Sequence, residues 1–299
     1  SQGSISIPTS DFLENKHLSK NEQHWPLIND IHGAITLKQA ALYLDFPNAK
    51  VYKARLKNVH GEISNLYADA PRLKINGTAN GTTQDFLSFI QQSPLIKELP
   101  IVDGMQAQGN GKLSLLLDLA LTHSAVGDKI SGTYTPVNNQ LNLPTSIAAN
   151  LPPLQALNGK LRFTQEALYL DAVKGSFAGG AFAANGSTRA QESIEIEGQA
   201  TVNALRDIPQ ITPFATLLDG TLKYQARLQL KQGAPNIRVY SDLGDLALNL
   251  PAPLTKARGQ ALPTQFIWHS DANGKAEFNL QAGSILRAQY FFSPNSTGL

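Results

Sequence analysis

Apolar and polar side chains alternate along several stretches of the chain. In residues 112–121 a leucine occupies every second position, and residues 221–230 place Leu, Tyr, Ala, Leu and Leu opposite Lys, Gln, Arg and Gln. Residues 194–202 continue the pattern with Ile, Ile, Gly, Ala and Val opposite Glu, Glu and Gln. Successive side chains of a β-strand point to opposite faces, so a period of two predicts strands. One apolar face and one wet face is typical of antiparallel sheets.

Two stretches depart from the alternation and show helical spacing instead. Thr83 is a suitable N-cap, and we expect a helix near residues 83–97. Its counterpart near residues 204–218 contains Pro209 and Pro213, which predict a broken helix because proline removes a helical hydrogen bond. Both helices are short enough to cap only one end of a sheet.

The chain contains an internal repeat. Gly33–Asp45 and Gly159–Asp171 share seven of thirteen residues at a separation of 126 (from 33 to 159), which chance does not readily produce. The later segments Arg72–Asn80 and Ser193–Thr201 also resemble one another, at a slightly different separation. Loop insertions between shared strands would cause that drift.

Together these patterns predict a mainly β fold: an elongated, curled antiparallel sheet that forms a groove, built from two repeats with two short helical segments. We expect a polar lead-in at 1–25, a first repeat at 26–150, a second repeat at 151–275, and the start of a further strand pair or a tail at 276–299.

Composition excludes several kinds of partner and site. The 299 residues are 42% hydrophobic and 16% charged, and 25 Lys and Arg are scattered among 23 Asp and Glu. A protein that reads nucleic acid concentrates its basic residues on one face, so we expect no nucleic-acid partner. The absence of cysteine excludes disulfides, thiolate zinc sites and thiol nucleophiles, and is compatible with an oxidising compartment.

Motifs that carry chemistry are missing from the sequence. The six histidines form no HxH or HExxH pair, and no Gly-x-Ser-x-Gly elbow occurs. The Gly-Lys pair at 111–112 lacks the glycine and the Ser or Thr that a phosphate loop requires. We therefore expect no catalytic residues, no metal, no cofactor and no enzymatic activity.

Three segments resemble a known family. Thr83–Leu95, Leu151–Phe163 and Ser241–Leu254 are similar to the YhdP branch of the AsmA-like proteins, and the resemblance extends over about residues 70–270. These segments are packing and turn signatures rather than active-site motifs, so they indicate the family but assign no role to individual residues.

The resemblance implies a location and a partner. Such proteins are large, are anchored in the inner membrane of Gram-negative bacteria by an N-terminal helix, and extend through the periplasm. Their sheets curl into an apolar groove linked to phospholipid movement towards the outer membrane. The resemblance therefore implies a periplasmic, monomeric middle segment that binds phospholipid acyl chains and reaches membranes through other parts of the full-length protein.

The candidate groove residues are the apolar members of the alternating strands: Leu113, Leu115, Leu117, Leu119, Leu121, Ile194, Ile196, Leu222, Tyr224, Leu228 and Leu230. Apolar faces commonly close on one another as a sandwich core, but two short helices cannot cover every stripe. A second hypothesis is an assembly module that adds strands of outer-membrane proteins to its sheet edge. A carbohydrate-binding sandwich is weaker, since Trp25 and Trp268 are the only tryptophans.

Overall fold

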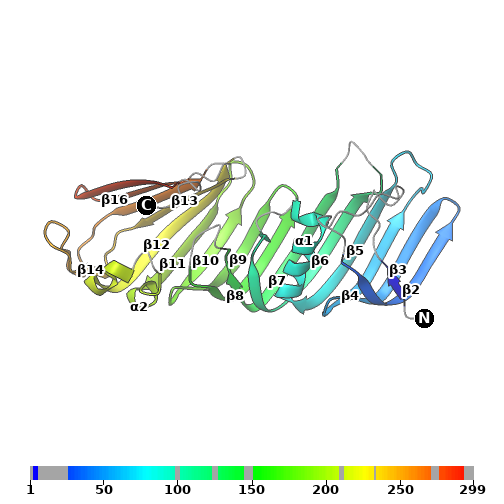
Figure 1. The fold of residues 1–299 in the computed structure, drawn as a ribbon, viewed down its shortest axis with the longest axis horizontal. Helices are drawn as coiled ribbons and strands as arrows, with labels where there is room; N and C mark the ends of the chain where they lie inside the picture. Colours follow the sequence, from blue (N-terminus) through cyan, green and yellow to red (C-terminus); the bar gives the residue numbers. More distant parts are fainter. Residues whose placement is uncertain are drawn as a thin grey trace. The chain divides into compact units, whose positions relative to one another are not determined.

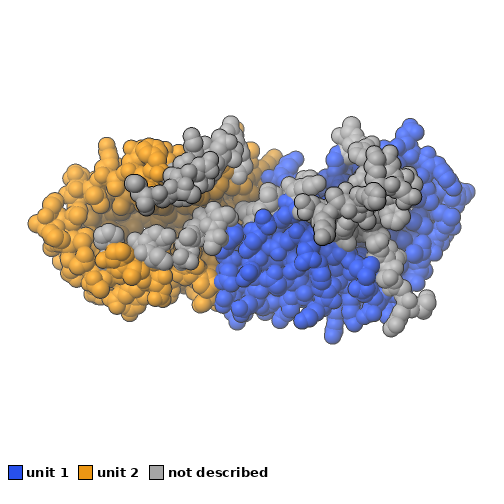
Figure 2. Space-filling model, in the orientation of Figure 1, with its two compact units in different colours: residues 1–147, 160–166 blue, residues 148–159, 167–299 orange. Residues whose placement is uncertain are grey.

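The computed structural model describes residues 3–5, 26–97, 102–122, 127–144, 151–208, 212–231, 234–270 and 276–292. The chain divides into two compact units, coloured separately in Figure 2. Unit 1 comprises residues 1–147 and 160–166, and unit 2 comprises residues 148–159 and 167–299. Most of the predicted lead-in, residues 6–25, lies outside the described residues.

Unit 1 is an antiparallel sheet in which each strand pairs with the next along the chain (Figure 1). Its strands are β1 (Gly3–Ile5), β2 (Ile28–Lys38), β3 (Ala41–Val51), β4 (Ala54–Ile63), β5 (Arg72–Thr82), β6 (Gln106–Ala120) and β7 (Lys129–Asn142). Strand β1 pairs with the beginning of β2. Strand β8 (Leu154–Thr164) is divided between the units, with its last residues from Lys160 onward in unit 1.

Unit 2 continues the same next-neighbour pairing from β9 to β13, and then through β15, β16 and β17. Its strands are β9 (Leu168–Phe177), β10 (Gly180–Ser187), β11 (Ile194–Thr201), β12 (Leu218–Lys231), β13 (Ala234–Ser241), β14 (Leu246–Leu248), β15 (Thr264–Ser270), β16 (Ala276–Ala282) and β17 (Leu286–Phe292). Strand β14 pairs with the first residues of β12, and its Leu248 also bridges to Lys256. The predicted mainly β, antiparallel architecture is confirmed.

The helical segments are short. Helix α1 (Thr83–Gln92) follows β5, is capped by Thr82, and leads into a 3₁₀ turn, η1 (Pro94–Lys97). Helix α2 (Val202–Leu205) follows β11 at the equivalent place in the second repeat, and a 3₁₀ segment, η3 (Thr212–Leu217), precedes β12. In Figure 1 helix α1 lies in front of β5, β6 and β7. We call the sheet face that carries α1 in unit 1 and α2 in unit 2 the inner face, and the opposite face the outer face.

The repeat extends to the backbone conformation. Asp30 in β2 and Ala156 in β8 both adopt a positive φ, 49° and 51°, and each is followed three residues later by a glycine with positive φ, Gly33 or Gly159. The β3–β4 turn has Tyr52 at φ 51°, and the β9–β10 turn has Ala178 at φ 46°. Each of these positions recurs 126 residues later (from 30 to 156, and from 52 to 178), so the two repeats share turns and bends as well as sequence.

Irregular registers bend the strands. The pairing shifts between Asn29 and Ala34 in β2, between Lys57 and His60 in β4, between Gln108 and Asn110 in β6, and between Ala184 and Gly186 in β10. A β-bulge bends its strand and increases the local twist, and repeated bulges curve a sheet. We attribute the curl of the two sheets to these positions.

The bend in β2 provides a test of this attribution. A methyl group at Gly33 would lie 2.0 Å from the carbonyl oxygen of Asp45, in a backbone conformation that favours glycine. Gly33→Ala should therefore lower the free energy of unfolding by about 2 kcal/mol or more. Gly127→Ala is the matched control because nothing lies within 4 Å of the added methyl group. Urea denaturation of both variants measures the difference; equal midpoints would contradict a structural role for the bend.

Candidate functional site

The inner face of unit 2 is apolar across consecutive strands. The register opposes Ile194 to Leu228 and Ala200 to Leu222 between β11 and β12, and Ala226 to Val239 between β12 and β13. Further along, the inner positions of β15 and β16 carry the residues Phe266, Trp268, Phe278 and Leu280. Phe266 and Phe278 make an edge-to-face contact, with ring centroids 4.6 Å apart.

These inner side chains are covered only in part. Near α2, the side chains of Leu222 and Tyr224 pack against a buried cluster that contains Ala200 and Leu205. Away from α2, Ile196, Leu228 and Leu230 and the aromatic residues of β15 and β16 are half-buried. In the orientation in which α2 faces the viewer, the surface of unit 2 is hollowed (Figure 2). Unit 2 therefore offers an apolar surface that its own helices leave partly open.

The inner face of unit 1 is more completely covered. Leu117 and Leu119 of β6 are each 4% exposed and pack in one cluster with Leu95 of η1 and Ile130 of β7. A second cluster places Phe86 of α1 over Val51, Ala54 and Ala79. The β2 end is open, since Ile35 and Leu37 there are 55% and 62% exposed. Helix α1 and η1 thus seal the part of the inner face on β5, β6 and β7.

A buried polar cluster fixes the first turn of α1 to β7. The hydroxyl groups of Thr83 and Tyr134 lie 2.5 Å apart, and Asn139 Nδ2 donates to both of these oxygens. Asn139 is 2% exposed, and its Oδ1 has no hydrogen-bond partner. Burial raises the pKa of Tyr134, while the bonds from Thr83 and Asn139 oppose that shift. These three side chains hold each other in place beneath the helix.

Glutamine side chains tie the rest of α1 to its surroundings. Gln84 Oε1 accepts a hydrogen bond from the backbone N–H of Ala107 at 2.8 Å. Gln91 donates to the carbonyl oxygens of Val102 and Met105, and Gln92 accepts from the hydroxyl of Tyr52. Helix α1 is therefore a fixed cover, bonded to β6, to the segment that precedes β6 and to the β3–β4 turn.

The outer faces are polar and carry the ion pairs. Arg227 of β12 lies 2.7 Å from Glu195 of β11, and Lys50 lies 2.7 Å from Asp30 in unit 1. The hydrogen bond from Lys223 lowers the pKa of Asp245. Exposed pairs of this kind add little stability. In these pairs the charged groups lie on the outer face, away from the apolar side chains.

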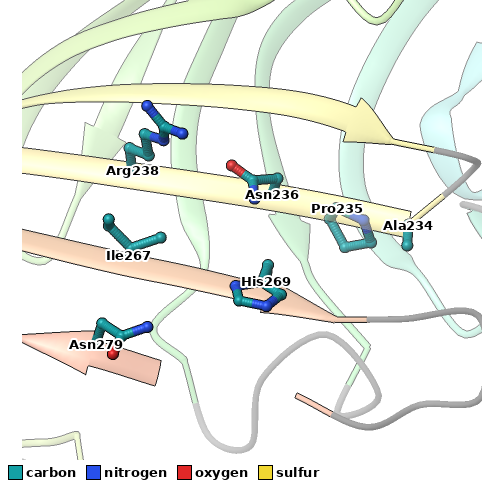
Figure 3. A pocket seen from close by; sticks show the side chains of 7 residues that line it. All are labelled: Ala234, Pro235, Asn236, Arg238, Ile267, His269 and Asn279. Carbon is teal, nitrogen blue, oxygen red and sulfur yellow. The ribbon is translucent and has the colours of Figure 1, made fainter. Parts of the chain in front are cut away.

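The depression in Figure 3 lies mainly on this polar face. It has a volume of about 360 Å³ and is lined by Ala234, Pro235, Asn236, Arg238, Ile267, His269 and Asn279 (Figure 3). Beside it, His269 Nε2 lies 3.0 Å from Glu277, whose pKa is lowered by hydrogen bonds from Asn279 and Gln289. These groups largely satisfy one another, so the apolar inner face remains the stronger candidate site.

Ten of the eleven residues predicted from the sequence fall into three groups, and Leu121 stands apart. Leu117, Leu119 and Ile194 are buried in the sheet, and Leu121 lies one residue beyond the end of β6. Leu113 and Leu115 are half-buried against the clusters under α1. The half-buried inner residues of unit 2 are Ile196, Leu222, Tyr224, Leu228 and Leu230. Sequence reasoning missed the aromatic stripe of β15 and β16, although its alternating Phe266, Trp268, Phe278 and Leu280 carry the same signal.

Comparison with known proteins identifies the family. The model of the family described as YhdP protein matches residues 20–298. The chain belongs to the YhdP family. No curated protein and no solved structure shows significant similarity to it.

Two further observations concern membrane and metal sites. No helix within the described ranges has the length and apolar character needed to cross a membrane. In the same part of the chain, no three His, Asp or Glu side chains gather closely enough to hold a metal ion. The apolar face is thus the feature from which we argue function.

The polar cluster under α1 yields a stability prediction. Tyr134→Phe removes the hydroxyl group that is hydrogen-bonded to Thr83 and Asn139. The substitution should therefore lower the free energy of unfolding by about 1–2 kcal/mol. It should also speed hydrogen exchange in the first turn of α1. Tyr240→Phe, at an exposed position of the outer face, is the control and should change neither quantity. Unchanged exchange in Tyr134→Phe would show that the cluster does not anchor the helix.

Proposed function

We propose that this chain is a non-catalytic, lipid-binding segment of a periplasmic bridge that conducts phospholipids between the inner and outer membranes. In this proposal acyl chains lie along the inner faces of the curled sheets. The observation that carries it is the segregation of side chains: cross-strand neighbours on the inner face are apolar over consecutive strands, while most of the paired positions on the outer face are charged or polar. Membership of the YhdP family, which belongs to the lipid-transport-related AsmA-like proteins, supports it.

Burial of methylene groups supplies the binding energy. Each buried CH₂ contributes about 0.8 kcal/mol, so a phospholipid acyl chain gains several kcal/mol from even partial contact with the inner face. Alkyl chains present no polar groups, and successive inner-face positions offer similar apolar contacts. A chain can therefore move from one position to the next at little cost in free energy, which is what conduction requires.

The open stretches indicate where lipid would contact the protein. In unit 2 these are the half-buried inner residues of β11 to β16, and in unit 1 the exposed Ile35 and Leu37 of β2. The part of the inner face under α1 is already covered by protein, so we assign Leu117 and Leu119 to the core that supports the groove.

The alternative, strand addition to an outer-membrane client, has one observation in its favour. Among the described residues, β17 pairs with β16 on one side and with no strand on the other. Its Tyr290 and Phe291 are 65% and 67% exposed. An exposed strand edge with apolar side chains can template pairing with another chain.

Envelope location and membrane contact belong to the same proposal. Proteins of the YhdP family are typically associated with the cell envelope, and a lipid-binding segment of this kind would work in the periplasm. We propose that membrane contact and anchoring reside in other parts of the full-length protein.

Lipid content of the purified chain tests the proposal. Native mass spectrometry and lipid extraction should detect copurified phospholipid. Leu228→Asp should reduce it about tenfold or more, because a carboxylate on the inner face costs more than about 1.4 kcal/mol to bury. Gln225→Asp, on the outer face of the same strand, is the matched control and should retain the wild-type amount.

Photo-crosslinking avoids dependence on the folding of the Asp variant. A photoreactive phenylalanine analogue at position 228 should capture lipid, whereas the same analogue at position 225 should capture none above background. A chain that copurifies without lipid and gives no adduct at position 228 would rule out the groove and leave strand addition as the better reading.

A further inference from the structure

Tyr224 places a hydroxyl group among apolar side chains on the inner face of unit 2. It lies on β12 directly opposite Gly198 of β11, and its ring covers that glycine: a methyl group at Gly198 would lie 2.6 Å from the Tyr224 hydroxyl oxygen. The side chain is half-buried and packs against the cluster near α2. The hydroxyl therefore lies flat along the sheet, at the margin of the partly open surface.

This hydroxyl has no hydrogen-bond partner among the described residues, in contrast to Tyr134 of unit 1. Both rings cover an inner-face glycine, Tyr134 over Gly111 and Tyr224 over Gly198. The Tyr134 hydroxyl is bonded to Thr83 and Asn139. For Tyr224, burial alone raises the pKa, with no hydrogen bond contributing. A half-buried phenol that donates to nothing in the protein is available to a ligand.

The surroundings of Tyr224 limit which acceptor it can receive. Its inner-face neighbours on β11 and β12 are Gly198, Ala200, Leu222 and Ala226, which carry no charge. The adjacent cations Lys223 and Arg227 alternate to the outer face, where they pair with Asp245 and Glu195. An anionic phosphate or carboxylate would lose its hydration here without gaining a counter-charge. A neutral carbonyl oxygen loses far less hydration free energy than an anion does, and a single hydrogen-bond donor satisfies it.

We propose that the Tyr224 hydroxyl donates a hydrogen bond to the ester carbonyl of a glycerolipid bound on the inner face of unit 2. This inference rests on the proposed lipid-binding function and adds a polar contact to it. The ester marks the junction between acyl chain and headgroup, so one donor at this point sets how far the chain enters the apolar surface.

The repeat shows that Tyr224 is not required by the fold. Gly77 in the first repeat corresponds to Gly198 in the second, and the residue opposite Gly77 is Leu115. Leu115 thus occupies in unit 1 the sheet position that Tyr224 occupies in unit 2, and the strand pairing is kept. The tyrosine adds a ring that covers the glycine and a hydroxyl that the first repeat lacks at this position, so a donor at this sheet position is specific to unit 2.

A competition between ester and ether lipids tests the contact. The purified chain is mixed with equal amounts of a diacyl phosphatidylcholine and its dialkyl ether analogue of equal chain length, and native mass spectrometry gives the bound ratio. The wild type should favour the ester about threefold to tenfold, the effect of one neutral hydrogen bond. Tyr224→Phe should bring the ratio to about one, and Tyr224→Leu should do the same. Tyr240→Phe, on the outer face, should keep the wild-type ratio.

The outcomes separate this inference from the function on which it rests. Ester preference that survives in Tyr224→Phe, or a wild-type ratio of one with both lipids bound, would overturn the role of Tyr224 and leave lipid binding intact. A wild type that binds neither lipid would overturn both. The same competition with diacylglycerol and its dialkyl analogue tests whether the phosphate headgroup is needed. Equal ester preference in both pairs supports recognition of the ester itself.

Discussion

Cross-strand register is the constraint on which the rest of this structure depends. Pairs such as Ile196 with Ala226 and Glu197 with Gln225 show that apolar residues meet apolar residues across β11 and β12, and polar residues meet polar ones. Because the side-chain period is two, a slip by one residue would move an entire strand's apolar set to the polar face. Holding that register over many strands produces one continuous apolar surface in each unit, and with it the candidate site.

Bending such a sheet without losing its two faces requires bulges at defined places. A bulge adds one residue to one strand, bends it, and allows the alternation to resume beyond the bend. The same positive φ values recur in both repeats, since Asp30 with Gly33 and Ala156 with Gly159 occupy equivalent positions. The repeats differ instead in their cover: α1 has ten residues and is bonded along its length, whereas α2 has four.

Sequence reasoning succeeded where one local signal decides the outcome. Alternation in residues 112–121 and 221–230 predicted the strands β6 and β12 and the face that each apolar residue shares. The same alternation could not tell which residues a helix would cover. Leu117 and Leu228 look alike in sequence, yet only Leu117 packs under Leu95 of η1. Likewise, the alanine at position 156 gives no hint of its positive φ, which the tertiary structure imposes.

Inner-face glycines argue for an open surface over a sealed sandwich. Two packed sheets fill their core with large side chains from both layers, and a glycine there leaves a void unless the opposite layer fills it. Here the same sheet fills the space: Leu44 lies over Gly61, Phe163 over Gly132 and Tyr224 over Gly198. Side chains that lie flat across neighbouring strands complete the surface without a second layer. A surface completed in this way has few protruding side chains along the sheet, which is the property that the proposed movement of an alkyl chain requires.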